Sequence, residues 1–211
     1  MKAYIHVGGE ILPQNITERP EEEDICIAAD SGYKNAKALG VEPTVIVGDF
    51  DSIDKGDKDS IKDGTEIYEV PIEKDFTDTQ LAVKIALEKG ARGIVIIGGL
   101  SGRLDHTLSN LAILENLYDN NIRAIIADGK NRVRYIKSSS ELIARSPYKY
   151  LSVLAKDEKV KGVSIEGCKY PLKNETLSCK NQYAISNEIE KNCALISVKK
   201  GGILIVESAD L

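Results

Sequence analysis

The 211-residue sequence contains no tryptophan, two phenylalanines and one methionine, and aromatic residues make up only 5% of it. It has no hydrophobic run long enough to span a membrane and no N-terminal signal peptide, so we expect a cytoplasmic protein without a membrane partner. The formal net charge is −5, whereas a nucleic-acid partner requires a basic face. Nucleic acid is therefore not expected as a partner.

The cysteines also lack an informative arrangement. Cys26, Cys168, Cys179 and Cys193 show no C-x-x-C spacing, so neither a zinc site nor a redox pair is indicated. Two of them lie in apolar, strand-like runs, which favours buried free thiols in a reducing compartment. No serine or cysteine stands in a nucleophile motif such as G-x-S-x-G, so covalent catalysis is not indicated.

The first half of the chain alternates apolar strand-like runs with helix-like segments. We expect strands at residues 3–7, 25–29, 44–47, 66–70, 93–97 and 122–127. Helices are expected at 31–39, at 77–89 after a capping box formed by Thr77 and Gln80, and over the leucine stripe between positions 104 and 117. Such alternation predicts a Rossmann-like, mainly parallel sheet covered by helices.

The pattern changes at about residue 130. Short runs rich in β-branched residues follow at 132–137, 150–154, 160–165, 172–177, 194–198 and 203–206, separated by Gly, Pro, Asn or Ser and without helical periodicity. This pattern is typical of a small antiparallel β-sandwich or barrel. We therefore expect two domains, an α/β domain at residues 1–129 and a β domain at residues 130–211.

An acid pair follows the third expected strand, where the apolar run 44–47 leads into Gly48, Asp49, Phe50 and Asp51. In an extended chain the two carboxylates point to the same side. They repel each other unless a cation lies between them, and a divalent cation fills this role best. Taken alone, the pair fits a solvated acidic turn better than a metal site.

Further acids alter this interpretation. Asp30, Asp49, Asp51 and Asp105 follow the ends of expected strands, and Asp78 opens an expected helix after another strand. The carboxyl ends of parallel strands share one sheet edge, where ligands bind, so these acids predict a shared metal–phosphate site. Asp49, Asp51 and Asp78 would supply oxygen ligands for Mg²⁺, although Asp78 is equally suited to the helix dipole.

A glycine-rich segment at residues 98–102 would let backbone amides approach a phosphate just before a helix N-terminus. It matches neither the Walker A motif nor the G-x-G-x-x-G fingerprint. Arg103, through its bidentate guanidinium, and Lys74 are the cations placed to contact phosphate oxygens. His106, beside Asp105 at the helix start, is either an acid–base group or a structural hydrogen-bonder.

Together these segments resemble the thiamine pyrophosphokinase family. The resemblance rests on DSG at 30–32, GDFDS at 48–52, KDFTD at 74–78, GGLSGRLDH at 98–106 and ISNE at 185–188, and so covers nearly the whole chain. It implies Mg²⁺-dependent transfer of the pyrophosphoryl group of ATP to the hydroxyl of thiamine, with release of AMP. It also implies a homodimer, in which thiamine lies between the α/β domain of one subunit and the β domain of the other.

The resemblance also implies residue roles. The catalytic residues would be Asp49, Asp51, Asp78, Asp105 and Arg103. ATP would be contacted by Asp30, Gly32, Lys74, Thr77, Gly98, Gly99, Ser101, Gly102 and His106. Thiamine would be contacted by Ser186 and Asn187, and either Asp78 or Asp105 would accept the proton of its hydroxyl. Some family members stack thiamine on a tryptophan of the β domain, which this chain lacks, and Lys74 stands where others carry glutamine.

Two other functions fit parts of the sequence. Asp49-Phe50-Asp51 after an apolar strand resembles the nucleophile motif of haloacid-dehalogenase phosphohydrolases, although that motif normally ends the first strand and here two strands precede it. The second alternative is a non-catalytic nucleotide or vitamin sensor whose β domain binds a partner. Formation of AMP from ATP and thiamine distinguishes the pyrophosphokinase from both.

Overall fold

The computed structural model describes residues 1–48, 61–69 and 76–210. Its contacts divide the chain into two compact units, Met1–Gly129 and Lys130–Leu211. Asp49, Asp51 and Lys74, which were predicted as site residues, lie outside the described residues. Within the described segments, no helix is both long and apolar enough to cross a membrane.

The first unit is built on a parallel sheet. Its strands are β1 (Ala3–His6), β2 (Ile25–Ala29), β3 (Val45–Gly48), β4 (Glu66–Glu69), β5 (Gly93–Ile97) and β6 (Arg123–Ala127). They lie in the order β4-β3-β2-β1-β5-β6, and every neighbouring pair is parallel. The chain moves outward from β1 to β4 and then continues on the other side of β1 with β5. The topological switch point, where such sheets bind ligands, therefore lies between β1 and β5.

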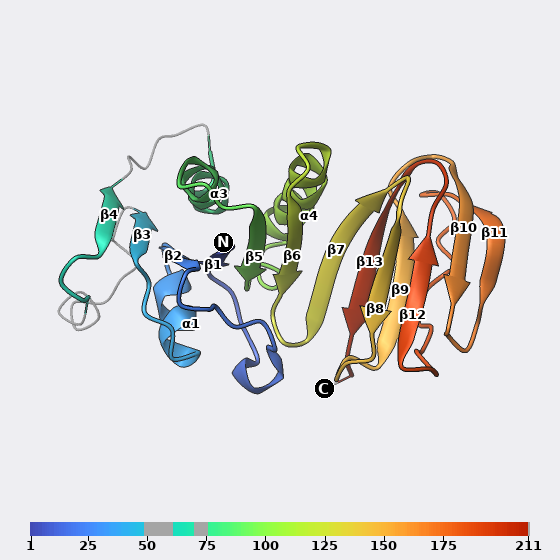
Figure 1. The fold of residues 1–211 in the computed structure, drawn as a ribbon, viewed down its shortest axis with the longest axis horizontal. Helices are drawn as coiled ribbons and strands as arrows, with labels where there is room; N and C mark the ends of the chain where they lie inside the picture. Colours follow the sequence, from blue (N-terminus) through green and yellow to red (C-terminus); the bar gives the residue numbers. More distant parts are fainter. Residues whose placement is uncertain (49–60, 70–75, 211) are drawn as a thin grey trace. The chain divides into compact units, whose positions relative to one another are not determined.

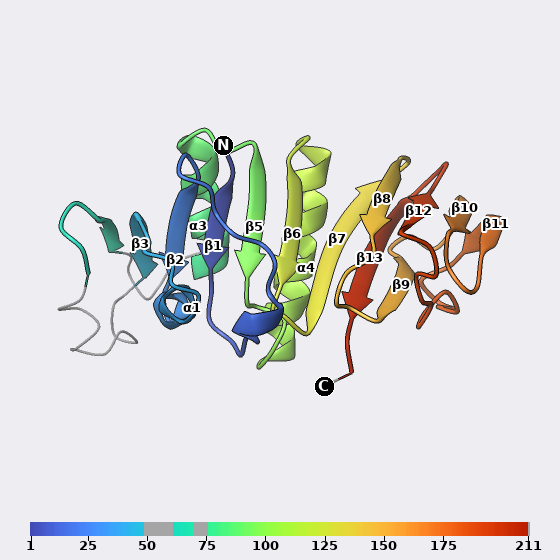
Figure 2. The same ribbon diagram turned by 60° about the horizontal axis from the view of Figure 1, so that its bottom comes forward.

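Helices cover both faces of this sheet. The helices are α1 (Gly32–Ala38), α3 (Asp78–Glu88) and α4 (Leu104–Asp119), and a short 3₁₀ turn, η1, spans Pro13–Asn15. α3 and α4 lie on one face and α1 on the other (Figure 1, Figure 2). Crossover connections between parallel strands are right-handed. The connections through α3 and α4 run across the sheet in the opposite direction to the connection through α1, so they lie on the opposite face. The predicted parallel α/β fold is confirmed.

The leucine stripe of α4 divides between two environments. Leu114 and Leu117 are each 1% exposed and pack in the core. Leu104 and Leu108 are instead 69% and 57% exposed. The helix was predicted correctly, but its leucines do not form a single buried face.

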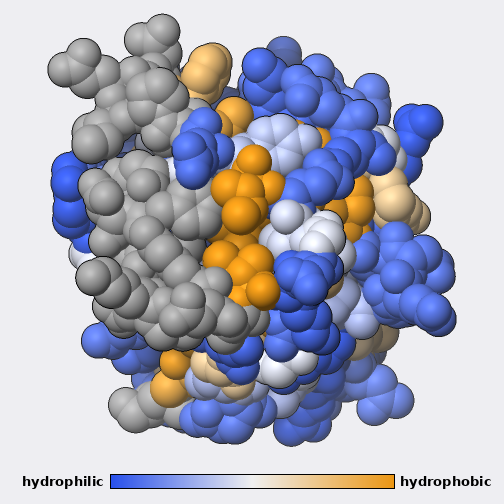
Figure 3. Space-filling model, turned by 90° about the vertical axis from the view of Figure 1, so that its left-hand side faces the viewer, coloured by the Kyte–Doolittle hydropathy of each residue, from blue (hydrophilic) through white to orange (hydrophobic). Residues whose placement is uncertain are grey.

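An apolar edge is also visible on the first unit. Figure 3 views the molecule from the β4 side and shows apolar side chains gathered in a patch on that face. On β4, the edge strand of the sheet, Ile67 is 50% exposed and Tyr68 38%. The carboxylate of Glu66 accepts hydrogen bonds from Lys89 Nζ at 2.7 Å and from the Tyr68 hydroxyl at 3.1 Å. These charged and polar contacts lie on the strand that would otherwise be open to pairing.

The second unit is antiparallel. Its strands are β7 (Asn131–Lys137), β8 (Ser140–Ala144), β9 (Tyr150–Ala155), β10 (Val160–Glu166), β11 (Leu172–Leu177), β12 (Cys193–Ser197) and β13 (Gly202–Ser208). β13 pairs with both β7 and β9, and the remaining strands form a sheet in the order β11-β10-β12-β8. The predicted antiparallel β fold is confirmed, and β8 is an additional strand that the sequence pattern did not indicate.

A buried charge cluster stabilises the second unit. The Glu207 side chain is 2% exposed and accepts hydrogen bonds from Arg132 Nε at 2.8 Å and Nη2 at 2.7 Å, from Arg134 Nη2 at 2.8 Å and from Ser146 Oγ at 3.0 Å. A buried carboxylate is tolerated only when its lone pairs are satisfied in this way. The cluster ties β13 to β7 and to the segment that follows β8.

The cysteines are all free, as predicted. Cys26 and Cys168 are buried, Cys193 is half-buried and Cys179 is exposed. Burial raises the pKa of the Cys26 and Cys168 thiols to about 11. Neither buried thiol therefore has the thiolate character that a nucleophile or metal ligand requires.

Candidate active site

Two glycine-containing turns meet at the switch point of the parallel sheet. Gly8 and Gly9 follow β1, and Gly98 and Gly99 follow β5. Val7 N donates to the carbonyl of Ile97 at 3.0 Å, and Gly99 N donates to the carbonyl of Gly8 at 3.1 Å. The pairing of β1 with β5 thus continues into the turns and holds them side by side.

Gly98 and Gly99 require glycine for two reasons. Their φ angles are 94° and 75°, in the left-handed region that side chains disfavour. A Cβ at Gly98 would also lie 2.7 Å from the carbonyl oxygen of Val7, and one at Gly99 would lie 2.6 Å from Nδ2 of Asn110. A compact turn of this kind lets backbone amides approach a ligand closely.

Three polar side chains brace these turns from within. Asn35 Nδ2 donates to the carbonyls of Val7 at 2.7 Å and Gly9 at 3.0 Å. Asn110, which is 5% exposed, donates to the carbonyl of Gly99 at 2.9 Å. Ser101 Oγ accepts from the backbone N–H of Glu10 at 2.8 Å and so links the two turns. Sequence analysis missed Asn35 and Asn110, although a polar residue on the buried side of a helix is the signal that would have found them.

Arg103 and Asp105 form a bidentate pair at the start of α4. Arg103 Nε donates to Asp105 Oδ1 at 3.1 Å, and Nη2 donates to Oδ2 at 2.6 Å. The two side chains are 75% and 63% exposed. The Arg103 guanidinium lowers the pKa of the Asp105 carboxyl, which also accepts from His106 N at 3.1 Å. A guanidinium beside a helix N-terminus and a glycine turn provides three anion-binding features in one place.

The start of α3 is fixed by the predicted capping box. Thr77 Oγ1 accepts from Gln80 N at 3.2 Å, and Gln80 Oε1 accepts from Thr77 N at 2.9 Å. Asp78 is the first residue of the helix. The Thr77 hydroxyl therefore has a structural role, while Asp78 stands where a carboxylate favours the helix dipole.

Asp30 lies beside the end of β3. Its N–H donates to the carbonyl of Val47 at 2.8 Å, and a Cβ on Gly48 would lie 3.3 Å from Asp30 Cα. Asp49 follows Gly48 directly in the sequence. Gly32 packs closely under β1, since a Cβ there would collide with the carbonyl oxygen of His6.

The sheet edge thus brings together many of the predicted residues. The described residues that follow carboxyl strand ends or open helices there are Asp30, Gly32, Thr77, Asp78, Gly98, Gly99, Ser101, Gly102, Arg103, Asp105 and His106. Among the described residues, no group of three or more His, Cys, Asp or Glu side chains is arranged to hold a metal ion. The predicted Mg²⁺ site includes Asp49 and Asp51, which lie outside them.

In the second unit, Asn187 organises the predicted thiamine contacts. Its side chain is buried, donates from Nδ2 to the Tyr170 carbonyl at 2.7 Å and accepts at Oδ1 from Tyr170 N at 2.9 Å. Ser186, whose φ is 57°, donates from its N–H to Ser152 Oγ at 3.0 Å. The Asn187 amide therefore fixes Tyr170 relative to Ser186. The Tyr170 side chain is 59% exposed, and sequence analysis did not single it out.

Fold and site together define a class of protein: a doubly wound α/β unit with paired glycine turns at its switch point, followed by an antiparallel β unit. A family model described as "Thiamin pyrophosphokinase, catalytic domain" matches residues 17–126, and one described as "Thiamin pyrophosphokinase, vitamin B1 binding domain" matches residues 139–203. The chain belongs to the thiamine pyrophosphokinase family, a family of ATP-dependent pyrophosphotransferases.

Relatives from several organisms agree with this assignment. Thiamine pyrophosphokinase of Bacillus subtilis is 30% identical over 205 residues, which are 96% of each chain. Thiamin pyrophosphokinase 1 of Caenorhabditis elegans is 29% identical over 175 residues, covering 78% of this chain and 70% of the relative. The solved structure of the Bacillus subtilis protein covers 100% of both chains with a TM-score of 0.91 at 29% identity. That of the Geobacillus thermodenitrificans protein has a TM-score of 0.85 at 28% identity, covering 100% of this chain and 98% of that one.

The family resemblance read from the sequence is therefore confirmed, together with the expectation of a pyrophosphotransferase. This interpretation is preferred to the phosphohydrolase and the non-catalytic sensor. The individual site residues remain predictions.

Proposed function

We propose that this chain transfers the pyrophosphoryl group of ATP to the hydroxyl of thiamine and yields thiamine diphosphate and AMP. The main support for the proposal is the pair of hydrogen-bonded glycine turns at the switch point, next to Arg103 at the start of α4. The same chain carries a segment matching a vitamin B1 binding domain. In this proposal the first unit binds the phosphates of ATP, and the second unit binds thiamine, the acceptor of the pyrophosphoryl group.

ATP binds at the carboxyl edge of the parallel sheet in this proposal. Its phosphates meet the backbone of residues 98–102 and the N-terminus of α4, and Arg103 turns its guanidinium from Asp105 to the phosphate oxygens. The remaining nucleotide contacts are Asp30, Gly32, Lys74, Thr77 and His106. Because pyrophosphoryl transfer depends mainly on positioning and charge neutralisation, such groups suffice without a covalent intermediate.

The proposed Mg²⁺ ligands are Asp49, Asp51 and Asp78. The donor chemistry fits, since carboxylate oxygens are the ligands that Mg²⁺ prefers. Gly48, which precedes Asp49 in the sequence, packs against Asp30. When bound, the ion supplies positive charge that offsets the charge on the phosphates.

Asp78 and Asp105 are the two candidates to accept the proton of the thiamine hydroxyl. Without ATP the Asp105 carboxyl is engaged by Arg103, which lowers its pKa. Movement of Arg103 to the phosphates would release this carboxylate, and Asp78 is also a proposed Mg²⁺ ligand, so both carboxylates are retained as candidates. A loose transition state requires little base strength, so the proton moves late.

Thiamine binds to the second unit, against Ser186 and Tyr170. Asn187 fixes the backbone of Tyr170, and the Tyr170 side chain is 59% exposed. An aromatic ring attracts the aminopyrimidine by stacking and the cationic thiazolium by cation–π interaction. Tyr170 thus takes the role that tryptophan fills in some family members.

We further propose a cytoplasmic homodimer in which each active site combines the α/β domain, residues 1–129, with the β domain, residues 130–211, of the partner. Residues 1–129 contain 13 Lys and Arg and 24 Asp and Glu, a formal net charge of −11, whereas residues 130–211 contain 15 and 9, a net charge of +6. Opposite charges favour contact between unlike units of two copies. The free cysteines agree with a reducing compartment.

An end-point assay with ATP, Mg²⁺ and thiamine, resolving AMP from ADP, tests the reaction. We expect AMP and thiamine diphosphate in equal amounts. ADP as the nucleotide product would contradict pyrophosphoryl transfer. ATP binding without turnover would support the sensor, and an aspartyl phosphate trapped at Asp49 with beryllium fluoride would support the phosphohydrolase.

Subunit complementation tests the shared site. Asp78→Asn should be inactive, and Tyr170→Ala should have little activity when the thiamine concentration is well below its raised KM, so the assay is run at such a concentration. After the two variants are mixed and reassociated, half of the dimers contain one intact site, and activity should return to about a quarter of wild type. If the two variants exchange subunits and the mixture still regains no activity, each site lies within one chain.

A further inference from the structure

A segment of the second unit, residues 182–187, runs along the outer edge of β9. β9 is the end strand of its sheet, with β13 as its neighbour. Leu151 and Asn187 exchange backbone hydrogen bonds of 2.8 and 3.0 Å, and Val153 N donates to the carbonyl of Ala184 at 2.7 Å. The segment contains both predicted thiamine contacts, so its pairing with β9 determines where these contacts lie.

The segment begins with a side chain that takes the place of a paired strand. Gln182 Oε1 accepts from Ala155 N at 3.0 Å, and Gln182 Nε2 donates to the carbonyl of Ala155 at 2.9 Å. One amide side chain thus satisfies both backbone groups of Ala155. It anchors the segment at the end of β9, where the backbone pairing has not yet begun.

The backbone of the segment turns at Ser186. From residue 181 to residue 185 the side chains alternate between exposed and half-buried positions, as they do along a strand. Continued alternation would turn Ser186 inward. Its φ is instead 57°, in the left-handed region, and Ser186 is exposed next to the exposed Ile185. Because a residue other than glycine is disfavoured in this region, other contacts must hold the turn.

Ser152 of β9 provides such a contact. Its Oγ accepts from the backbone N–H of Ser186 at 3.0 Å. Leu151 and Val153, on either side of Ser152, bond to the segment through their backbones, whereas Ser152 bonds to it through its side chain. The hydroxyl therefore pairs an N–H that has left the regular path of a strand.

We propose that Ser152 is a positioning residue for the acceptor substrate. Its hydroxyl fixes the left-handed conformation of Ser186 and thereby sets the affinity for thiamine, without touching thiamine itself. The inference rests on the proposed function, because it takes thiamine to be the acceptor that Ser186 contacts. It adds a residue of β9 that lies 34 positions before Ser186 in the chain.

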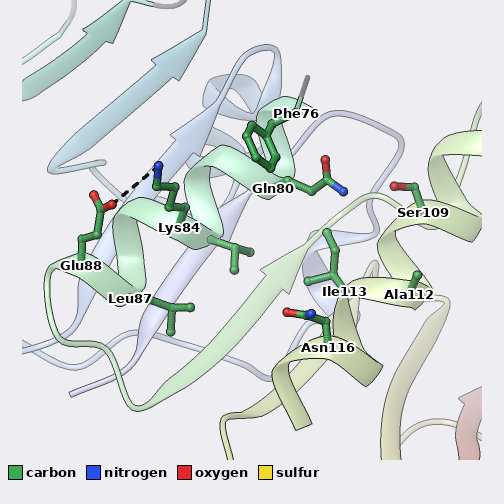
Figure 4. A pocket seen from close by; sticks show the side chains of 10 residues that line it. Phe76, Gln80, Lys84, Leu87, Glu88, Ser109, Ala112, Ile113 and Asn116 are labelled. Atoms are coloured by element: carbon green, nitrogen blue, oxygen red, sulfur yellow. Dashed lines mark ion pairs between the residues drawn. The ribbon is translucent and has the colours of Figure 1, made fainter. Parts of the chain in front are cut away.

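A groove between α3 and α4 in the first unit is an alternative site for a small cationic acceptor. It has a volume of about 550 Å³. The acidic side chain among its lining residues, Glu88, is paired with Lys84 at 3.9 Å (Figure 4). These two charges cancel, so the described lining of the groove has no net charge with which to attract a thiazolium cation. The acceptor is therefore assigned to the second unit.

Ser164 provides a matched control in the same unit. Its Oγ accepts from the backbone N–H of Asn174 at 3.0 Å, and the φ of Asn174 is also 57°. Ser152 and Ser164 are both half-buried. The two serines thus make the same kind of contact to a left-handed residue, but Ser152 makes it to the proposed acceptor segment and Ser164 to β11.

The test measures thiamine binding by equilibrium dialysis. In Ser152→Ala the dissociation constant should rise about threefold to tenfold, because one neutral hydrogen bond is lost. Ser152→Thr, which keeps the hydroxyl, and Ser164→Ala should bind thiamine as wild type does. Ser152→Val has the shape of Ser152→Thr without the hydroxyl and should bind as weakly as Ser152→Ala. In steady-state kinetics, Ser152→Ala should raise the KM for thiamine and leave kcat and the KM for ATP unchanged.

Urea unfolding shows which variants fold, and Ser152→Ala and Ser164→Ala should lose similar stability. An unchanged dissociation constant in folded Ser152→Ala or Ser152→Val would overturn the proposal. An equal rise in Ser164→Ala would overturn it as well, because the effect would then reflect general loosening of the unit. AMP formation is measured separately. If wild type binds thiamine but forms no AMP, the proposed reaction fails while the binding comparison still decides the role of Ser152. A wild type that binds no thiamine would overturn the inference itself.

Discussion

His6 predicts a pH dependence of folding stability. It is the last residue of β1, is 1% exposed, and neither of its ring nitrogens has a hydrogen-bond partner among the residues that the structure describes. Burial, with a smaller contribution from Arg19, lowers the pKa of His6 to about 4. The imidazole is therefore neutral in the folded protein at physiological pH.

The magnitude follows from proton linkage. The folded-state pKa is about 4 and the unfolded-state value 6.5, so the full difference corresponds to about 3.4 kcal/mol. Above pH 6.5 neither state binds the proton and no stability is lost. Between pH 6.5 and 4 the unfolded state binds it preferentially, so the free energy of unfolding falls, by about 2 kcal/mol at pH 5.0.

The assay is urea unfolding at pH 7.5 and pH 5.0. The chain contains two histidines, His6 and the exposed His106, so His106→Gln is the control. Wild type and His106→Gln should both lose about 2 kcal/mol more between the two pH values than His6→Leu does. An equal loss in His6→Leu would refute the reasoning, because the pH dependence would then arise from other groups.

Three further predictions concern the site and the core. Arg103→Ala should lower turnover by more than about tenfold, since a charge-assisted phosphate contact contributes roughly 1.5–3 kcal/mol; wild-type turnover would show that Arg103 is only a surface charge. Tyr170→Ala should raise the KM for thiamine with little change in the KM for ATP, whereas Tyr170→Phe should retain both values; an unchanged KM in Tyr170→Ala would remove the stacking role. Glu207→Gln should destabilise the protein by about 3–5 kcal/mol in denaturant unfolding, because it removes the buried carboxylate that Arg132 and Arg134 share. The exposed Glu158, paired with Lys180, is the control, and Glu158→Gln should cost less than about 1 kcal/mol.

Much of the fold could be predicted because local signals and tertiary structure agree. The interior strands β1 and β5 are continuous apolar runs, as strands buried on both faces must be. The capping box at Thr77 sets the start of α3, and the expected helices 31–39 and 77–89 differ from α1 and α3 by one residue at each end. The common edge of Asp30, Asp78 and Asp105 follows directly from parallel strand direction.

Other features could not be predicted from local pattern. The leucines of α4 follow one another at spacings of three or four residues, but repeated three-residue steps drift around the helix. Leu104 and Leu108 are therefore exposed, whereas Leu114 and Leu117 are buried. β8 was missed because only Ile143 among its five residues is buried. Tyr170 becomes prominent only through the Asn187 amide, 17 positions further along the chain.

The pairing of β1 with β5 determines when the proposed phosphate site can form. β1 precedes the other five strands of the parallel sheet in the chain, yet it lies inside the sheet, and its neighbour β5 begins at Gly93. The turns at Gly8 and Gly98 therefore cannot meet until about ninety more residues have left the ribosome. During that interval β1 can pair on only one side, with β2, and its other edge stays open. Assembly of the active site and closure of this edge are thus a single, late folding event that depends on a contact of long sequence separation.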